Sequence, residues 1–201
     1  MRRSAPLASA GVALACAALA WAPAAVIQHL AFDRQAILGG EIWRLWSAHL
    51  VHFSLQHALL DGAVFFFVAS VAEHAIGTRR LGIALALGAP FIGLGLLAAV
   101  PGLAYYRGAS GLATMAALLA GAALWRGSAA RRRVLALLAL GLAARTAAEA
   151  CGISASVAGL PDHVALAWQA HVLGASAGGL MVLAGRRRFT LHNRAIVGIV
   201  S

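Results

Sequence analysis

The sequence contains no lysine and few charged residues of any kind. Only 11% of its 201 residues are charged, and six Asp and Glu stand against 16 basic residues that are all Arg. A soluble domain carries about a quarter charged residues, so this composition excludes an ordinary soluble protein. Cysteine is also scarce. Cys16 and Cys151 stand in or beside apolar runs without the spacing of a metal site or redox pair, which favours ordinary buried thiols.

Long apolar runs take the place of the missing charge. Hydrophobic residues make up 62% of the chain, and a run of ~20 apolar residues is long enough to cross a bilayer as a helix. We therefore predict an all-α integral membrane protein that forms one bundle of six transmembrane helices. The predicted division is a first helix within residues 1–30, a core over 31–188 with spans at about 54–76, 81–100, 110–125, 133–151 and 163–185, and a tail over 189–201.

The first apolar run, from about Leu7 to Leu30, has two interpretations. Its length is sufficient for a retained transmembrane helix. The small residues around Pro23 also suit a signal-peptidase site, which would make the run a removable signal peptide. We favour the retained helix, because its loss would leave an odd number of spans and disturb the arginine distribution.

The arginines indicate how the bundle is oriented. If six spans alternate, most arginines fall on one face of the membrane, and the positive-inside rule makes that face cytoplasmic. Both termini are then predicted to be cytoplasmic. The outer face has Arg34, Arg44 and Arg107, and the cytoplasmic face has Arg2, Arg3, Arg79, Arg80, Arg126, Arg131, Arg132, Arg133, Arg186, Arg187, Arg188 and Arg194. Topology thus explains the net charge of +10, and we expect no nucleic-acid partner.

Two reactive side chains are predicted to lie at the same depth in the bilayer. Ser110 opens the fourth span and His171 lies in the sixth, and both spans run from the outer face to a cytoplasmic arginine. At ~1.5 Å rise per residue, both side chains lie roughly 23 Å above that boundary. An ionisable side chain inside a bilayer is costly and is therefore a functional candidate. A histidine beside a serine can accept its proton, and a third, acidic residue is not required in principle.

Small residues around both side chains favour contact between the two helices. Ala170, Gly174 and Gly178 recur every four residues on one face of the sixth span, and Gly108 and Gly111 flank the serine. Small residues at this spacing let two helices approach closely in lipid. The pattern is also typical of ordinary helix packing, which is compatible with a catalytic pair.

A group of histidines near the second span suggests a metal or haem site as an alternative. They are His49, His52, His57 and His74. Haem ligands in a membrane cytochrome would be buried on facing helices, whereas this cluster lies largely in or near the outer loop. We therefore expect no metal and no cofactor, and we predict that His52 binds loop backbone.

Two opposite charges, Arg145 and Glu149, lie one turn apart inside the fifth span. An intrahelical ion pair is the simpler interpretation, and a proton or ion path is the alternative. A small transporter would be expected to show repeated halves with broken helices. The sequence has no convincing internal repeat, so a transporter is disfavoured.

Four motifs of this chain resemble those of the rhomboid intramembrane serine proteases. The resemblance covers about residues 35–188, and the motifs are specific only in combination. They are Trp43-Arg44 in the first outer loop, His52-Phe53-Ser54-Leu55-Gln56-His57 entering the second span, Gly108-Ala109-Ser110-Gly111, and Ala170-His171-Val172-Leu173-Gly174 continuing to Gly178. Glu73 also stands where rhomboids often carry a glutamate at the end of the second span.

The resemblance implies hydrolysis of a peptide bond inside the membrane. Ser110 would attack, and His171 would act as general base and then as general acid. The backbone N–H of Ser110 and the side chain of His57 would bind the oxyanion. Gly108 is predicted to support the same oxyanion site. Rhomboids usually have Asn where this chain has Asp61. A protonated Asp61 could donate to the oxyanion, whereas an ionised one could only accept hydrogen bonds and orient His57.

The compact form and the wording Tyr106-Arg107-Gly108-x-Ser110-Gly111 are most similar to the rhombosortase branch. That branch is associated with removing Gly-Gly-containing C-terminal anchors from exported bacterial proteins. The resemblance implies membrane-anchored protein substrates in a bacterial inner membrane, with an active site that opens toward the periplasm; it predicts no particular oligomeric state. The alternative is an inactive rhomboid-like protein that binds transmembrane segments. The presence of Ser110 and His171 argues against it, and Asp61 argues weakly for it.

Overall fold

The computed structural model describes residues 5–125, 127–153 and 168–197, with side chains described through residue 185. Its elements in chain order are α1 (Leu7–Leu19), α2 (Ala24–Leu30), β1 (Phe32–Asp33), α3 (Arg34–Leu38), α4 (Arg44–Ser47), α5 (Leu55–Ile76), α6 (Thr78–Ala99), β2 (Tyr105–Tyr106), α7 (Ser110–Leu124), α8 (Ala129–Ala150) and α9 (Trp168–Val197). The predictions for Arg2, Arg3, Arg126, the loop beyond residue 153, the start of the sixth span at 163–167 and the end of the tail lie outside the described residues.

Helices dominate the described residues and have the character of a membrane fold. Two of them, α5 and α6, are long and apolar enough to cross a bilayer, and α1 and α7 are apolar but shorter. Large apolar side chains such as Phe67 and Leu87 are exposed on the outer faces of α5 and α6. Lipid is the solvent in which such faces are stable.

The first apolar run is not the single helix that we predicted over its length. α1 ends at Leu19, and α2 begins after Pro23, whose backbone is extended. Proline has a fixed φ and no N–H, and it pushes the residue before it away from helical geometry. The prediction of one helix within residues 1–30 is therefore corrected to two helices with a turn between them.

The N-terminus of α1 is held by a carboxylate from the far end of α5. Glu73 is buried and accepts the backbone N–H groups of Ala8 at 3.0 Å and Ser9 at 2.9 Å. The Ser9 hydroxyl donates to the same carboxylate at 2.5 Å. The first N–H groups of a helix have no partner within the helix and favour an anion. This contact binds α1 to the bundle.

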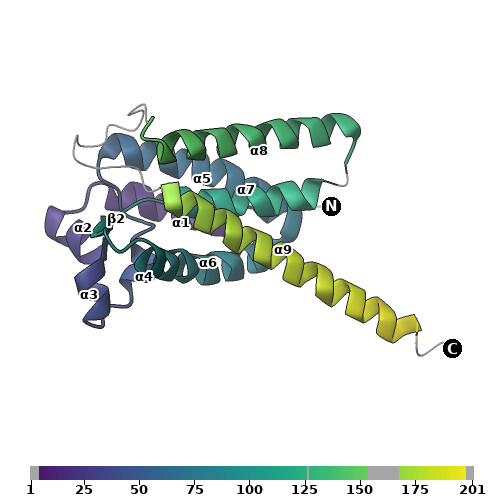
Figure 1. The fold of residues 1–201 in the computed structure, drawn as a ribbon, viewed down its shortest axis with the longest axis horizontal. Helices are drawn as coiled ribbons and strands as arrows, with labels where there is room; N and C mark the ends of the chain where they lie inside the picture. The colour runs from purple at the N-terminus through teal and green to yellow at the C-terminus, as the bar shows by residue number, and fades with distance from the viewer. Residues whose placement is uncertain (1–4, 126, 154–167, 198–201) are drawn as a thin grey trace.

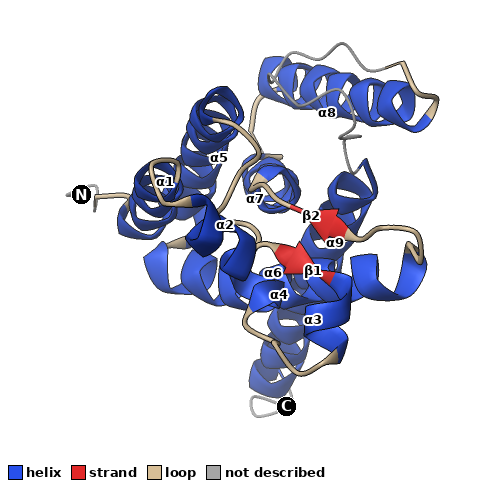
Figure 2. Ribbon diagram, turned by 90° about the vertical axis from the view of Figure 1, so that its left-hand side faces the viewer, coloured by secondary structure: helices blue, strands red, loops and turns tan. Residues whose placement is uncertain are grey.

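α7 occupies the middle of the bundle, with α5 and α9 beside it (Figure 2). Most residues of its first three turns are buried. α8 lies along the outside of the bundle (Figure 1), and Glu149 is the only buried residue within Ala129–Ala150. α9 continues as helix to Val197, past the predicted end of the sixth span at 185, and extends beyond the other helices (Figure 1).

The loop between α2 and α5 is fastened to α6. Pro90 has no N–H, so the carbonyl of Ala86 lacks its helical partner. Trp46 Nε1 donates to that carbonyl at 2.9 Å. Leu45 fills the space beside Gly93, where an added Cβ would lie 2.9 Å from Leu45 Cδ2. The loop is thus held in place against α6.

The same loop also pairs with the segment that leads into α7. β1 and β2 are antiparallel, with Phe32 opposite Tyr106 and Asp33 opposite Tyr105. The Gly108 N–H donates to Ala48 O at 3.0 Å. These contacts position the chain immediately before Ser110.

Candidate active site

Ser110 is the first residue of α7, at the end of a sharply turned loop. Gly108 has a φ of +132°, a backbone conformation that residues other than glycine rarely adopt. An added Cβ there would also lie 3.1 Å from Asp61 Oδ2 and 3.4 Å from the His57 ring. The requirement for glycine two residues before the serine therefore has both a conformational and a steric cause.

The peptide group between Gly108 and Ala109 is held at both ends. Its carbonyl oxygen accepts the Tyr106 hydroxyl at 2.8 Å and lies 3.3 Å from His49 Nδ1. Its N–H donates to Asp61 Oδ2 at 2.6 Å. A carboxylate that accepts a short backbone hydrogen bond is a strong partner, so the loop before Ser110 has little freedom.

Tyr106 and His49 were not among the predicted site residues, although both are buried at the site. Their rings meet edge to face at 5.6 Å between centroids. Burial raises the pKa of Tyr106, so its hydroxyl stays protonated and donates to Gly108. Burial also lowers the pKa of His49, which keeps the ring neutral between the carbonyls of Gly108 and Ala89. The position of Tyr106 next to the serine motif was the available signal. His49 was visible in the sequence only as a member of the histidine group that was weighed as a metal or haem site.

Asp61 connects two histidines to this loop. Its Oδ2 lies 3.1 Å from His52 Nε2 and 3.8 Å from His57 Nε2. The two histidine rings meet at right angles, with their centroids 4.9 Å apart. Because Oδ2 already accepts the Ala109 N–H, this geometry favours Asp61 as a hydrogen-bond acceptor over the protonated donor. His52 faces this carboxylate, where we had expected it to bind loop backbone.

The described histidines do not gather around one point. His49 faces Tyr106, whereas His52 and His57 face Asp61. His74 is exposed and contacts Ser70 O within its own helix. Among the described residues, no group of three or more His, Cys, Asp or Glu has the arrangement of a metal site.

α7 and α9 meet backbone to backbone. A Cβ added at Gly174 would overlap the carbonyl oxygen of Gly111, and one added at Gly111 would lie 3.0 Å from Ala170 O. One turn farther along, a Cβ at Gly178 would lie 3.0 Å from Met115 O. The close approach predicted from the spacing of small residues is present. We call this contact the α7–α9 seam.

Ser110 and His171 adjoin the seam from opposite helices, because Ser110 precedes Gly111 and His171 follows Ala170. His171 is buried and Ser110 is partly buried. The hydrogen bonds of the described residues do not include one between the Ser110 hydroxyl and His171. Instead His171 Nδ1 lies 3.1 Å from Glu149 Oε2, a contact that sequence reasoning missed.

The first backbone N–H groups of α7 have no hydrogen-bond acceptor within the helix. Its N-cap residue, Ala109, provides no side-chain hydrogen bond, and the first N–H groups of a helix have no acceptor within it. The Ser110 N–H is one of these groups. It is a donor of the kind that binds an oxyanion.

Three of the predicted motif residues lie away from this centre. Trp43 donates to His29 O at 3.3 Å. Arg44 is buried in the outer loop, where it pairs with Glu41 at 2.6 Å and donates to two backbone carbonyls. Glu73 holds α1. All three stabilise the surroundings of the site.

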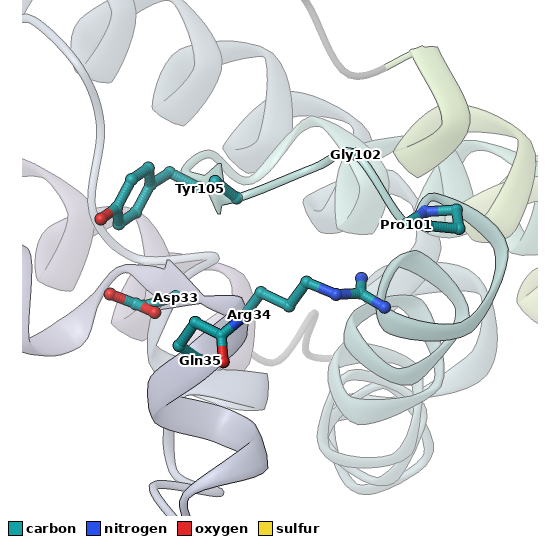
Figure 3. A pocket seen from close by; sticks show the side chains of 7 residues that line it. Asp33, Arg34, Gln35, Pro101, Gly102 and Tyr105 are labelled. Carbon is teal, nitrogen blue, oxygen red and sulfur yellow. The ribbon is translucent and has the colours of Figure 1, made fainter.

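A separate hollow of about 200 Å³ lies beside β2, and Ser110 is not among its lining residues (Figure 3). Tyr105 lines it, while Tyr106 faces the site, as successive residues of a strand do. Arg34 extends across the hollow and donates to Val100 O at 3.3 Å. The hollow therefore does not contain the Ser110 hydroxyl.

A family model described as the Rhomboid domain matches residues 39–188. The matched range contains Ser110, His171 and every residue of the centre described above. No curated protein matches the chain.

Proposed function

Because this chain belongs to the rhomboid family, we propose that it is an intramembrane serine protease in which Ser110 is the nucleophile and His171 the general base. Rhomboids are generally intramembrane serine proteases that act on membrane proteins, and the family also has inactive members. The observation that supports the proposal is the α7–α9 seam, because Gly111 and Ala170, the neighbours in sequence of Ser110 and His171, approach each other there.

The proposed reaction begins when Ser110 Oγ attacks the carbonyl carbon of the scissile peptide bond. His171 accepts the serine proton and then gives it to the leaving amine, which leaves an acyl-enzyme ester on Ser110. Water, activated by the same histidine, hydrolyses the ester and frees the serine. Apo sites often have long or misaligned catalytic hydrogen bonds, so the missing Ser110–His171 bond is compatible with this sequence.

Two donors are proposed for the oxyanion, the Ser110 N–H and the His57 side chain. His57 stands in the first turn of α5, beside Gly108. We infer that Asp61 is an acceptor and not a third donor, because its Oδ2 accepts the Ala109 N–H and lies 3.1 Å from His52 Nε2. Its proposed role is to hold the loop and the two histidines. One oxyanion donor can be worth ~100- to 1,000-fold in rate. We therefore expect this centre to turn over more slowly than a site in which an asparagine supplies a third donor.

The finer assignments belong to the same proposal. We infer six membrane spans with cytoplasmic termini in a bacterial inner membrane, supported by the arginine distribution. We also infer that the first span is retained, supported by the hydrogen bonds that Glu73 accepts from the N-terminus of α1. We also infer the rhombosortase branch and removal of Gly-Gly-containing C-terminal anchors. Glycines weaken a substrate helix by ~1 kcal/mol each, which exposes the peptide bond to attack.

Labelling with a fluorophosphonate probe tests the proposal. The full chain, in detergent or liposomes, is expected to be labelled, and both Ser110→Ala and His171→Ala are expected to lose labelling. Ser176→Ala and His74→Ala are matched controls, because both side chains are exposed and each forms a hydrogen bond to a carbonyl of its own helix. A folded wild-type protein that is not labelled would contradict the proposal and favour an inactive binder of transmembrane segments.

A further inference from the structure

We propose that Glu149 is a positioning residue for His171: it accepts a hydrogen bond from His171 Nδ1 and thereby directs Nε2 toward Ser110. This inference rests on the proposed protease function. It assigns to Glu149 the place that an aspartate holds in a Ser-His-Asp triad, where the carboxylate fixes the tautomer and stabilises the imidazolium that forms.

The geometry of α8 is the first support. Glu149 lies in the last turn of α8, and it is the only residue of Ala129–Ala150 that is buried. Its side chain is 3% exposed, and its Oε2 lies 3.1 Å from His171 Nδ1. Burial of this carboxylate inside the bundle, next to the candidate base, costs free energy.

The second support is that three buried atoms at this contact lack an aligned partner. Within the described residues, Glu149 Oε1, Glu149 Oε2 and His171 Nδ1 have no hydrogen bond of good geometry. An unsatisfied buried polar atom is costly. The two atoms are already at hydrogen-bond distance, so a rotation of the imidazole that aligns Nδ1–H with Oε2 would satisfy both.

Arg145 places its guanidinium beside the same carboxylate. Its Nε lies 3.0 Å from Glu149 Oε1, and its own side chain is 53% exposed. The pair that is visible in the sequence as an intrahelical contact is therefore extended across to α9. An ionised carboxylate accepts hydrogen bonds only, so it selects the tautomer of His171 that carries its proton on Nδ1. That tautomer leaves Nε2 free to accept the serine proton.

Glu149→Gln is the decisive variant. An amide can turn its NH₂ toward Nδ1, which favours the tautomer with the proton on Nε2, and that tautomer cannot accept the serine proton. We expect the maximal rate of fluorophosphonate labelling to fall by roughly 100-fold. The probe concentration at half-maximal rate should stay the same. Glu149→Asp should recover part of the rate, and Thr146→Val, one turn away on α8, should keep all of it.

A spectroscopic measurement separates positioning from a merely structural role. The ¹⁵N chemical shifts of the His171 ring, assigned by their loss in His171→Ala, should report a protonated Nδ1 in the wild type and a protonated Nε2 in Glu149→Gln. Arg145→Gln should lower the labelling rate by only several-fold. Because Arg145 is largely exposed, this variant also serves if Glu149→Gln does not fold.

The outcomes are distinct. Equal labelling rates and an unchanged tautomer in Glu149→Gln would overturn the role of Glu149 and leave the protease proposal standing. A wild type that is never labelled would overturn the protease proposal, while the ¹⁵N shifts would still decide whether Glu149 sets the tautomer.

Discussion

Replacing Gly174 with alanine would place a methyl group where α9 lies directly on α7. An added Cβ at this position overlaps the carbonyl oxygen of Gly111, which is backbone and cannot turn away. The seam is tight on the other side as well, since a Cβ at Gly111 would lie 3.0 Å from Ala170 O. Comfortable contact needs roughly 3.5 Å. The two helices must therefore separate by roughly 1 Å to accept the methyl group.

That separation acts directly on the proposed catalytic pair, because Ser110 and His171 adjoin the seam from opposite helices. A misplacement of about 1 Å can cost about 100-fold in rate, and we expect a loss of that order in fluorophosphonate labelling. Overpacking also costs ~1–3 kcal/mol of stability. The better helix propensity of alanine offsets up to ~1 kcal/mol of this.

Gly179→Ala is the matched control for this experiment. It changes the same residue type on the same helix, and its added Cβ has no atom within 4 Å. Both variants gain the same propensity, so the difference between their labelling rates and unfolding temperatures isolates the seam. If Gly174→Ala is labelled as fast as Gly179→Ala and unfolds at the same temperature, the seam does not set the distance between the pair.

Two further predictions concern buried carboxylates. Asp61→Ala leaves the Ala109 N–H without its acceptor, so we expect the free energy of unfolding, measured by thermal unfolding, to fall by ~1–3 kcal/mol. Asp61→Asn keeps an amide oxygen at this position and should lose less than half of that free energy. Equal losses in the two variants would contradict the acceptor role of Asp61. Glu73→Gln weakens the anchor of α1 and should lower the unfolding temperature, with His74→Ala as the unchanged neighbour. An unfolding temperature in Glu73→Gln equal to that of the wild type would show that the charge of the carboxylate does not stabilise the docking of α1.

The features that could be predicted from the sequence are those that a local pattern encodes. Hydropathy found the apolar helices, because a bilayer imposes length and composition on each span separately. The spacing of Ala170, Gly174 and Gly178 predicted the close approach of α9 to another helix, since small residues every fourth position leave a flat face. The family follows from the motifs, and the match over residues 39–188 confirms it.

The features that were missed depend on contacts between distant segments. A hydropathy average does not register the turn before Pro23, because the flanking residues are apolar on both sides. The pairing of Phe32–Asp33 with Tyr105–Tyr106 involves only two residues on each strand, too few to produce an alternating pattern. The spacing of Arg145 and Glu149 revealed their ion pair, but which helix the glutamate faces depends on the rotation of α8 within the bundle.

The two carboxylates beside the proposed catalytic pair have different electrostatic tasks. The charges of Glu149 and Asp61 both favour the imidazolium that forms when His171 accepts a proton. Asp61, however, also stands beside the proposed oxyanion donors, where a negative charge opposes the developing oxyanion. Its hydrogen bond from Ala109 and its contact with His52 at 3.1 Å partly compensate that negative charge. Glu149 has no such conflict, because it contacts the imidazole at Nδ1, the nitrogen that does not carry the serine proton. The centre can therefore keep an aspartate where asparagine is usual, provided that His52 remains close enough to pair with it.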